Sequence, residues 1–181
     1  ASTSAGSVNT AAWSGTASSS ALFKGIAFDV TNKTKLNSVT VYPKNTAALT
    51  PITVSLYDAT GNIVSGTTPV TFTPTLNTGA IGAVSQVVTL NYNIPIGNGY
   101  RLVASNGLVA TTNTLGNSTG VITYPTTGAI RLLGNVSALN DAVSTTANTT
   151  NCFHNLTFDE TCESVTRTPV TATVGCNSIV N

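Results

Sequence analysis

The stretch VVTLNYNIPIGNGYRLVAS, residues 87–105, decides the fold class of this chain. Apolar and polar side chains alternate on both sides of its central PIGNG, and alternation with period two places one face of a strand against a core. Pro95 has no amide hydrogen to donate, and Gly97 and Gly99 tolerate positive φ, so the chain is expected to turn there. The stretch is therefore predicted to form two strands joined in a hairpin, and folding alone explains its residues.

The same alternation recurs along the chain. Strands are predicted at residues 21–30, 36–43, 51–57 and 68–76, around Ile130 and Leu132, and as a final antiparallel pair at 152–158 and 165–174. After residue 57, Asp58 can accept hydrogen bonds from turn amides and Gly61 can supply a positive φ, so the chain turns before a return strand that begins at residues 63–64. Such short strands with frequent turn signals predict an all-β fold, a two-sheet antiparallel β-sandwich of jelly-roll or Ig-like topology.

The composition agrees with an all-β class. Charged residues make up 7% of the 181 residues, far below the usual quarter or so, and about a fifth of the chain is threonine, a β-branched residue that favours strands. The net charge is +1 and the chain has no Lys/Arg cluster, which argues against nucleic acid as a partner. No run of about 18 apolar residues is present, so no membrane span is predicted.

The length fits one domain. Residues 1–22 are small and polar and are expected to form an irregular lead-in or an edge strand, residues 23–174 the β-sandwich, and residues 175–181 a tail or a linker to a next domain. The chain begins ASTSAGSVNT, without a methionine or a charged leader, and reads as a mature or excised segment. Its low charge is typical of exported proteins, so an extracellular location is expected.

Three cysteines, Cys152, Cys162 and Cys176, lie near the end of the chain. They lack the C-x-x-C spacing of a zinc site, and in an exported protein a disulfide is expected among them. Cys152 with Cys162 and Cys162 with Cys176 are both plausible pairs, and the spacing does not choose between them.

Few residues could carry catalysis. His154 is the only histidine, and although Cys152 shares its strand face, neighbours on one face lie about 7 Å apart at the backbone, a poor fit for a nucleophile and its base. Three acids, Asp159, Glu160 and Glu163, gather in DETCE and are the candidate ligands for a structural calcium ion. A solvated turn is the simpler explanation, so neither a metal site nor another cofactor is predicted, and the protein is not expected to be an enzyme.

Aromatic side chains are the candidate glycan contacts, because their apolar faces can stack on sugar rings. Trp13, Tyr100 and Tyr124 are the residues singled out for this role. They suggest a carbohydrate-binding module, with rings on one sheet face or on the loops around residues 106–123.

Four segments resemble a known family. They are LNSVTVYP…ITVSLYDATGNIV (residues 36–64), VVTLNYNIPIGNGYRLVAS (87–105), GVITYPTTGAI (120–130) and CESVTRTPVTATV (162–174). Their order is similar to that in β-sandwich modules repeated in large secreted and cell-surface proteins of the Bacteroidota. The resemblance implies export through the type IX route and a supporting role in an adhesin, a surface filament or the accessory region of an enzyme, with no shared catalytic residues.

Two functional hypotheses follow. The first is a non-catalytic extracellular module that serves adhesion or spacing in a cell-surface or filamentous protein, with neighbouring domains or copies of itself as partners. The second is a carbohydrate-binding module accessory to a secreted enzyme, with surface glycans as partners.

Overall fold

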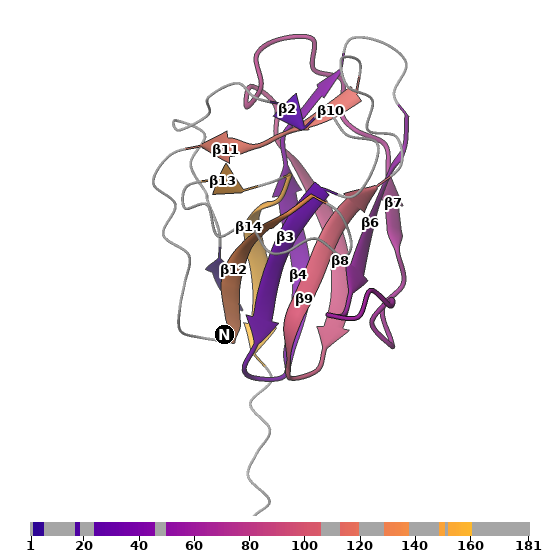
Figure 1. Cartoon of the computed structure of the whole chain (residues 1–181). Coiled ribbons are helices and arrows are strands. Elements are labelled where there is room, and N and C mark those ends of the chain that lie inside the picture. Colours follow the sequence, from indigo (N-terminus) through magenta and orange to yellow (C-terminus); the bar gives the residue numbers. More distant parts are fainter. Residues whose placement is uncertain are drawn as a thin grey trace, which may run out of the picture.

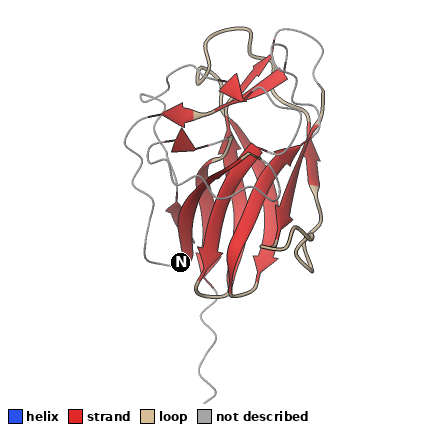
Figure 2. Cartoon of the chain, viewed as in Figure 1, coloured by secondary structure: helices blue, strands red, loops and turns tan. Residues whose placement is uncertain are grey.

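The structure is a computed structural model that describes residues 2–5, 17–18, 24–45, 50–105, 113–119, 129–137, 149–150 and 152–160. Within these residues all regular structure is β, as the sequence predicts (Figure 2). The strands are β1 (Ser2–Ala5), β2 (Ala17–Ser18), β3 (Lys24–Val30), β4 (Thr34–Val41), β5 (Pro43–Asn45), β6 (Ile52–Tyr57), β7 (Val70–Phe72), β8 (Gln86–Ile94), β9 (Gly97–Ser105), β10 (Asn113–Gly116), β11 (Ser118–Thr119), β12 (Ile130–Val136), β13 (Thr149–Thr150) and β14 (His154–Glu160).

The strands form two larger and two smaller sheets, and every described pairing is antiparallel. One large sheet has four strands in the order β1-β14-β4-β8, and the other has five in the order β12-β3-β9-β6-β7. The small sheets, β2-β10-β5 and β11-β13, lie beyond one end of the long strands, at the top of Figure 1.

The two large sheets share one hydrophobic core. Their inward residues, such as Leu36 and Tyr92 on one sheet and Phe28 and Leu102 on the other, are almost fully buried and belong to a single cluster. The Tyr92 hydroxyl also donates to the Val54 carbonyl oxygen at 2.9 Å, and this bond joins β8 to β6 across the core. Burial of the alternating apolar positions is thus what holds the two sheets to each other.

Residues 87–105 do form two strands, but the predicted hairpin is wrong. β8 pairs with β4, whereas β9 lies between β3 and β6 in the other sheet. The strand β8 ends at Ile94 and the chain turns at Pro95 and Ile96, so the glycines already belong to β9, where Gly99 has a φ of +71°. The connection is therefore an arch that carries the chain from one sheet to the other.

A second arch lies beside the first. Residues 31–33 connect β3 in the five-stranded sheet to β4 in the four-stranded sheet. Thr34 is the register partner of Ile94, and Val30 is the register partner of Gly97, so the two arches start and end on paired strands. Figure 1 places both at the lower end of the large sheets, which is called the arch end below.

The predicted turn after β6 is confirmed. The Asp58 carboxylate accepts from the backbone amides of Thr60 and Asn62, each at 2.9 Å, and Gly61 has a φ of +87°. The return is shorter than expected, because Ile63 makes only an isolated bridge with Tyr57 and the paired strand begins at Val70.

The outward side of β4 is more covered than the alternation predicts. Thr40 and Tyr42, which alternate with the buried Val39 and Val41, are both only 8% exposed. The Tyr42 ring meets the ring of His154 edge to face with centroids 5.2 Å apart. Both faces of the sheet are therefore packed near the small sheets, and period two alone cannot reveal a second covered face.

Two asparagines fix the long connection between β7 and β8. The Asn77 backbone amide donates to the Asn45 side-chain oxygen at 2.7 Å, and the Asn45 backbone amide donates to the Asn77 backbone carbonyl oxygen at 2.9 Å. The Asn77 side chain also donates to the carbonyl oxygens of Pro43 and Ala80. Because both side chains are buried, each bond replaces one that the group would otherwise make to water.

Candidate functional site

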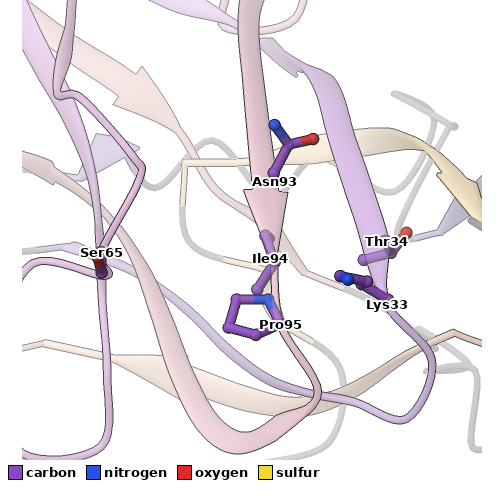
Figure 3. A pocket seen from close by; sticks show the side chains of 6 residues that line it. All are labelled: Lys33, Thr34, Ser65, Asn93, Ile94 and Pro95. Atoms are coloured by element: carbon purple, nitrogen blue, oxygen red, sulfur yellow. The ribbon is translucent and has the colours of Figure 1, made fainter.

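A hollow of about 270 Å³ opens at the arch end. Its lining residues come from three places in the chain: the second arch and the start of β4, the loop between β6 and β7, and the end of β8 with the first arch (Figure 3). They are Lys33, Thr34, Ser65, Asn93, Ile94 and Pro95. We call this hollow the arch pocket.

The floor of the arch pocket is built into the paired strands. Thr34 and Ile94 are opposite each other in the register of β4 and β8, and both are buried. The Thr34 hydroxyl donates to the Asp159 carbonyl oxygen at 2.9 Å, which ties β4 to β14 on its other side. A floor held by two strand pairings is a fixed surface.

The rim of the arch pocket is exposed and polar. Lys33, Ser65, Asn93 and Pro95 are all solvent-exposed, and Figure 3 shows Ser65 and Lys33 on opposite sides of the end of β8. Lys33 brings the one charged side chain among the six lining residues. The site therefore offers a cation, an amide and a hydroxyl around an apolar surface made by Ile94 and Pro95.

A buried carboxylate braces the same end of the molecule. Asp29, 4% exposed, accepts from the Gly99 backbone amide at 2.9 Å and from the Arg131 guanidinium, whose Nε lies 3.1 Å away. It thereby joins β3, β9 and β12 just above the arches. Charge-assisted bonds of this kind fix the start of β9, where the bulged Gly99 leaves the regular ladder.

His154 lies in the scaffold. It is 1% exposed, and its Nε2 lies 3.1 Å from the Gly116 carbonyl oxygen, which can only accept, so Nε2 carries the proton. Burial lowers the pKa of His154 from 6.5 to about 4, against a smaller opposite effect of the Gly116 bond. The side chain is thus neutral at physiological pH and orders the contact between β14 and the small sheets.

The structure describes two of the three candidate calcium ligands, and the carboxylates of both accept hydrogen bonds from neighbouring segments. The Asp159 carboxylate accepts from the Asn37 side-chain amide at 2.9 Å, and the Glu160 carboxylate accepts from the Ala129 backbone amide at 3.3 Å. Glu163 lies outside the described residues. In the described part of the chain, no three His, Cys, Asp or Glu side chains gather where they could hold a metal ion.

The disulfide prediction lies largely outside the described residues, which include Cys152 but neither Cys162 nor Cys176. Cys152 is fully buried in the shared core, with a φ of +65°, and its backbone amide donates to the Asn117 side-chain oxygen at 3.1 Å. Its position follows from packing at the start of β14.

Of the three aromatic residues proposed to stack on glycans, only Tyr100 is described. It is 6% exposed, packs against Phe28 with ring centroids 6.0 Å apart, and donates its hydroxyl to the Pro95 carbonyl oxygen at 3.1 Å. A ring inside the core has no free face for a sugar, so the prediction for Tyr100 is corrected. Trp13 and Tyr124 lie outside the described residues.

Sequence reasoning did not find the arch pocket. Its residues are unremarkable one by one, and only the two arches bring Lys33 beside residues 93–95. The signal that was available is the pair of short breaks, Thr-Asn-Lys at residues 31–33 and Pro-Ile at 95–96, each following a strand with a strongly apolar face.

Comparisons of the chain with protein-family models, with curated proteins and with solved structures found no match. Among the residues that the structure describes, no helix is long and apolar enough to cross a membrane.

Proposed function

We propose that this chain is a non-catalytic extracellular module, built as a two-sheet β-sandwich, that serves adhesion or spacing in a bacterial cell-surface or filamentous protein. The shared core and the Tyr92–Val54 bond between the two large sheets support the sandwich. The resemblance to secreted modules of the Bacteroidota supports export through the type IX route.

The observation that carries the proposal is the open edge of β8. This strand has nine residues and β4 as its one strand neighbour in the described part of the chain. Its outward side chains are Val87, which is 65% exposed, and the exposed Thr89, Asn91 and Asn93. The strand is bulged at Asn91, but its edge carries neither lysine nor proline, and such an edge can accept a strand from another chain, which suits a protein that assembles with copies of itself.

The polar groups considered for chemistry support a non-catalytic role. His154 is buried and neutral, Asp29 and Asp159 are hydrogen-bonded between strands, and Asp58 closes its own turn. A general acid or base needs to face a substrate with a pKa near the working pH, and these groups face the protein.

The experiment is to image the protein on intact cells of its native source, and to measure the size of the purified chain by light scattering. Filaments or long arrays are expected on the cells, and concentration-dependent oligomers in solution. The double variant Val87→Lys/Thr89→Lys places two charges on the β8 edge and is expected to shift the oligomers to monomers.

Thr68→Lys is the charge control, because Thr68 is exposed in the loop before β7 and belongs to no strand. It should leave the oligomers unchanged. A wild-type chain that remains monomeric at every concentration, and dispersed on its cells, overturns the assembly proposal.

Glycan binding is the second candidate function. With Tyr100 buried, the observation that favours it is the arch pocket, which offers polar groups around an apolar surface at an exposed end of the molecule.

A further inference from the structure

We infer that the arch pocket binds a sugar residue that carries a carboxylate. This inference rests on the proposed adhesive function, because it names the class of ligand to which the module adheres.

The charge of the arch pocket selects for an anion. Lys33 is exposed on the rim, and none of the other five lining residues is charged. A lysine ammonium on a flexible stem interacts with a carboxylate as a point charge. A neutral sugar has no negative charge to pair with this cation.

The neutral polar groups suit sugar hydroxyls. Asn93 presents a donor and an acceptor in one amide, and Ser65 presents both in one hydroxyl. Figure 3 shows Asn93 on β8 and Ser65 on a separate segment of the chain. Neighbouring hydroxyls of a sugar ring both donate and accept, so they can satisfy both side chains, whereas a simple anion cannot.

The apolar part of the lining suits the C–H face of a sugar ring. Ile94 forms the floor and Pro95 the adjoining rim, so a ring can exclude water there while its polar edge reaches Lys33 and Asn93. A volume of about 270 Å³ lies just below the usual range of small-molecule pockets, which indicates one sugar residue rather than a long chain.

The site is also fixed before any ligand arrives. Thr34 and Ile94 are strand residues in register, and the nearby Asp29 bonds fix the start of β9. A ligand therefore meets a floor that is already ordered, which limits the entropic cost of binding.

The test is an NMR titration of the folded chain with a hexuronic acid, with the matching neutral hexose and with acetate. The acid is expected to give saturable shifts at the arch end with a Kd on the order of 1 mM. The neutral hexose and acetate are each expected to bind at least roughly tenfold more weakly, because each lacks one half of the recognised chemistry. Equal binding of acetate and the acid, or no saturable shift with the acid, overturns the inference.

The variant Lys33→Met keeps an unbranched stem and removes the charge, so it is expected to weaken binding at least roughly tenfold. Lys44→Met is the matched control, because Lys44 is a partly exposed lysine on β5, which pairs with β10 beyond the opposite end of the large sheets. Asn93→Asp adds a negative charge at the rim and should also weaken the binding of the hexuronic acid. Undiminished binding by Lys33→Met overturns the role of the charge.

Free and glycan-borne acids are distinguished by a polysaccharide that ends in the same hexuronic acid. Binding to it supports the adhesive role, and binding to the free sugar alone assigns the pocket to a soluble ligand and overturns that role. If the chain forms oligomers but binds no hexuronic acid, only the inference about the arch pocket is overturned. A chain that binds the acid but never assembles overturns the assembly proposal alone.

Discussion

His154 makes the stability of this protein sensitive to mild acid. Its folded-state pKa is about 4 because burial disfavours the charged ring, whereas an exposed histidine has its pKa near 6.5. Between these two values the unfolded chain takes up a proton that the folded chain does not. Stability therefore falls as the pH is lowered through this window, since protons are bound preferentially by the unfolded state.

The expected loss between pH 6.5 and 4 is about 3 kcal/mol in the free energy of unfolding, measured by urea denaturation at each pH. His154→Gln can still donate to the Gly116 carbonyl oxygen but does not titrate, so its stability should be nearly flat over the same window. The lowered pKa of Asp58, caused chiefly by the Asn62 backbone amide, adds acid sensitivity only below about pH 4. A wild-type profile as flat as that of the variant contradicts this prediction.

Gly25 has no room for a side chain. A Cβ at this position would lie 1.9 Å from the Leu102 carbonyl oxygen, and that atom is backbone within the paired strand β9. Gly25→Ala is therefore expected to cost more than about 4 kcal/mol, beyond the usual range for one substitution.

Gly66→Ala is the matched control for backbone strain alone. Gly66 has a φ of +81°, but nothing lies within 4 Å of the position of a Cβ, so its replacement should cost about 1 kcal/mol. Chemical denaturation of the two variants measures the difference. Similar costs for both would show that β3 and β9 separate easily at Gly25.

Residues whose role is local could be predicted from the sequence. Asp58 lies before a Gly61 that supplies the positive φ of the turn, and its carboxylate closes the turn over four residues. Asn45 and Asn77 have equally specific roles, but their partners are 32 residues apart and no local pattern distinguishes them from the many other asparagines. The arch pocket was missed for the same reason.

At the scale of elements, the asparagine pair fixes the β7–β8 connection to β5. Asn77→Ala is expected to lower the free energy of unfolding by about 2–3 kcal/mol, because it leaves the Pro43 carbonyl oxygen without its buried donor. Asn62→Ala, in an exposed turn where the side chain donates to the Thr60 hydroxyl, should change it by less than about 0.5 kcal/mol. Thermal or urea unfolding compares the two.

The pairing is tested by a double-mutant cycle. Because the two side chains share one network, Asn45→Ala combined with Asn77→Ala should cost less than the sum of the single variants. Strict additivity would mean that the two asparagines act independently and would refute a shared clamp.

Strand positions followed from period two, but strand partners did not. The alternation in β8 and β9 correctly placed Leu90 and Leu102 in a core, yet the same alternation is compatible with a hairpin or with an arch. The choice between hairpin and arch depends on which other strands pair with β8 and β9. β4 pairs with one edge of β8, and β3 and β6 pair with the two edges of β9. Such pairings depend on residues distant in the chain, which a local window cannot contain.

At the scale of the molecule, the shared core predicts a single unfolding unit. Leu36 on β4 packs in the same cluster as Leu102 on β9, although the strands belong to different sheets. Leu36→Ala is expected to cost about 2–5 kcal/mol, and native-state amide exchange should report the same loss for amides of β4 and of β9. Protection of β9 that does not change would show that the two sheets open separately.

The arches have a consequence for a chain that is delivered one end first. Asp29 is separated from Arg131 by 102 residues, and Thr34 from Asp159 by 125. A ribosome therefore releases β3 and β4 long before β12 and β14, and until then β3 has only β9 and β4 has only β8 of the strands that belong beside them. Both large sheets are completed only when these late strands emerge, so a chain that is still being synthesised cannot close its core.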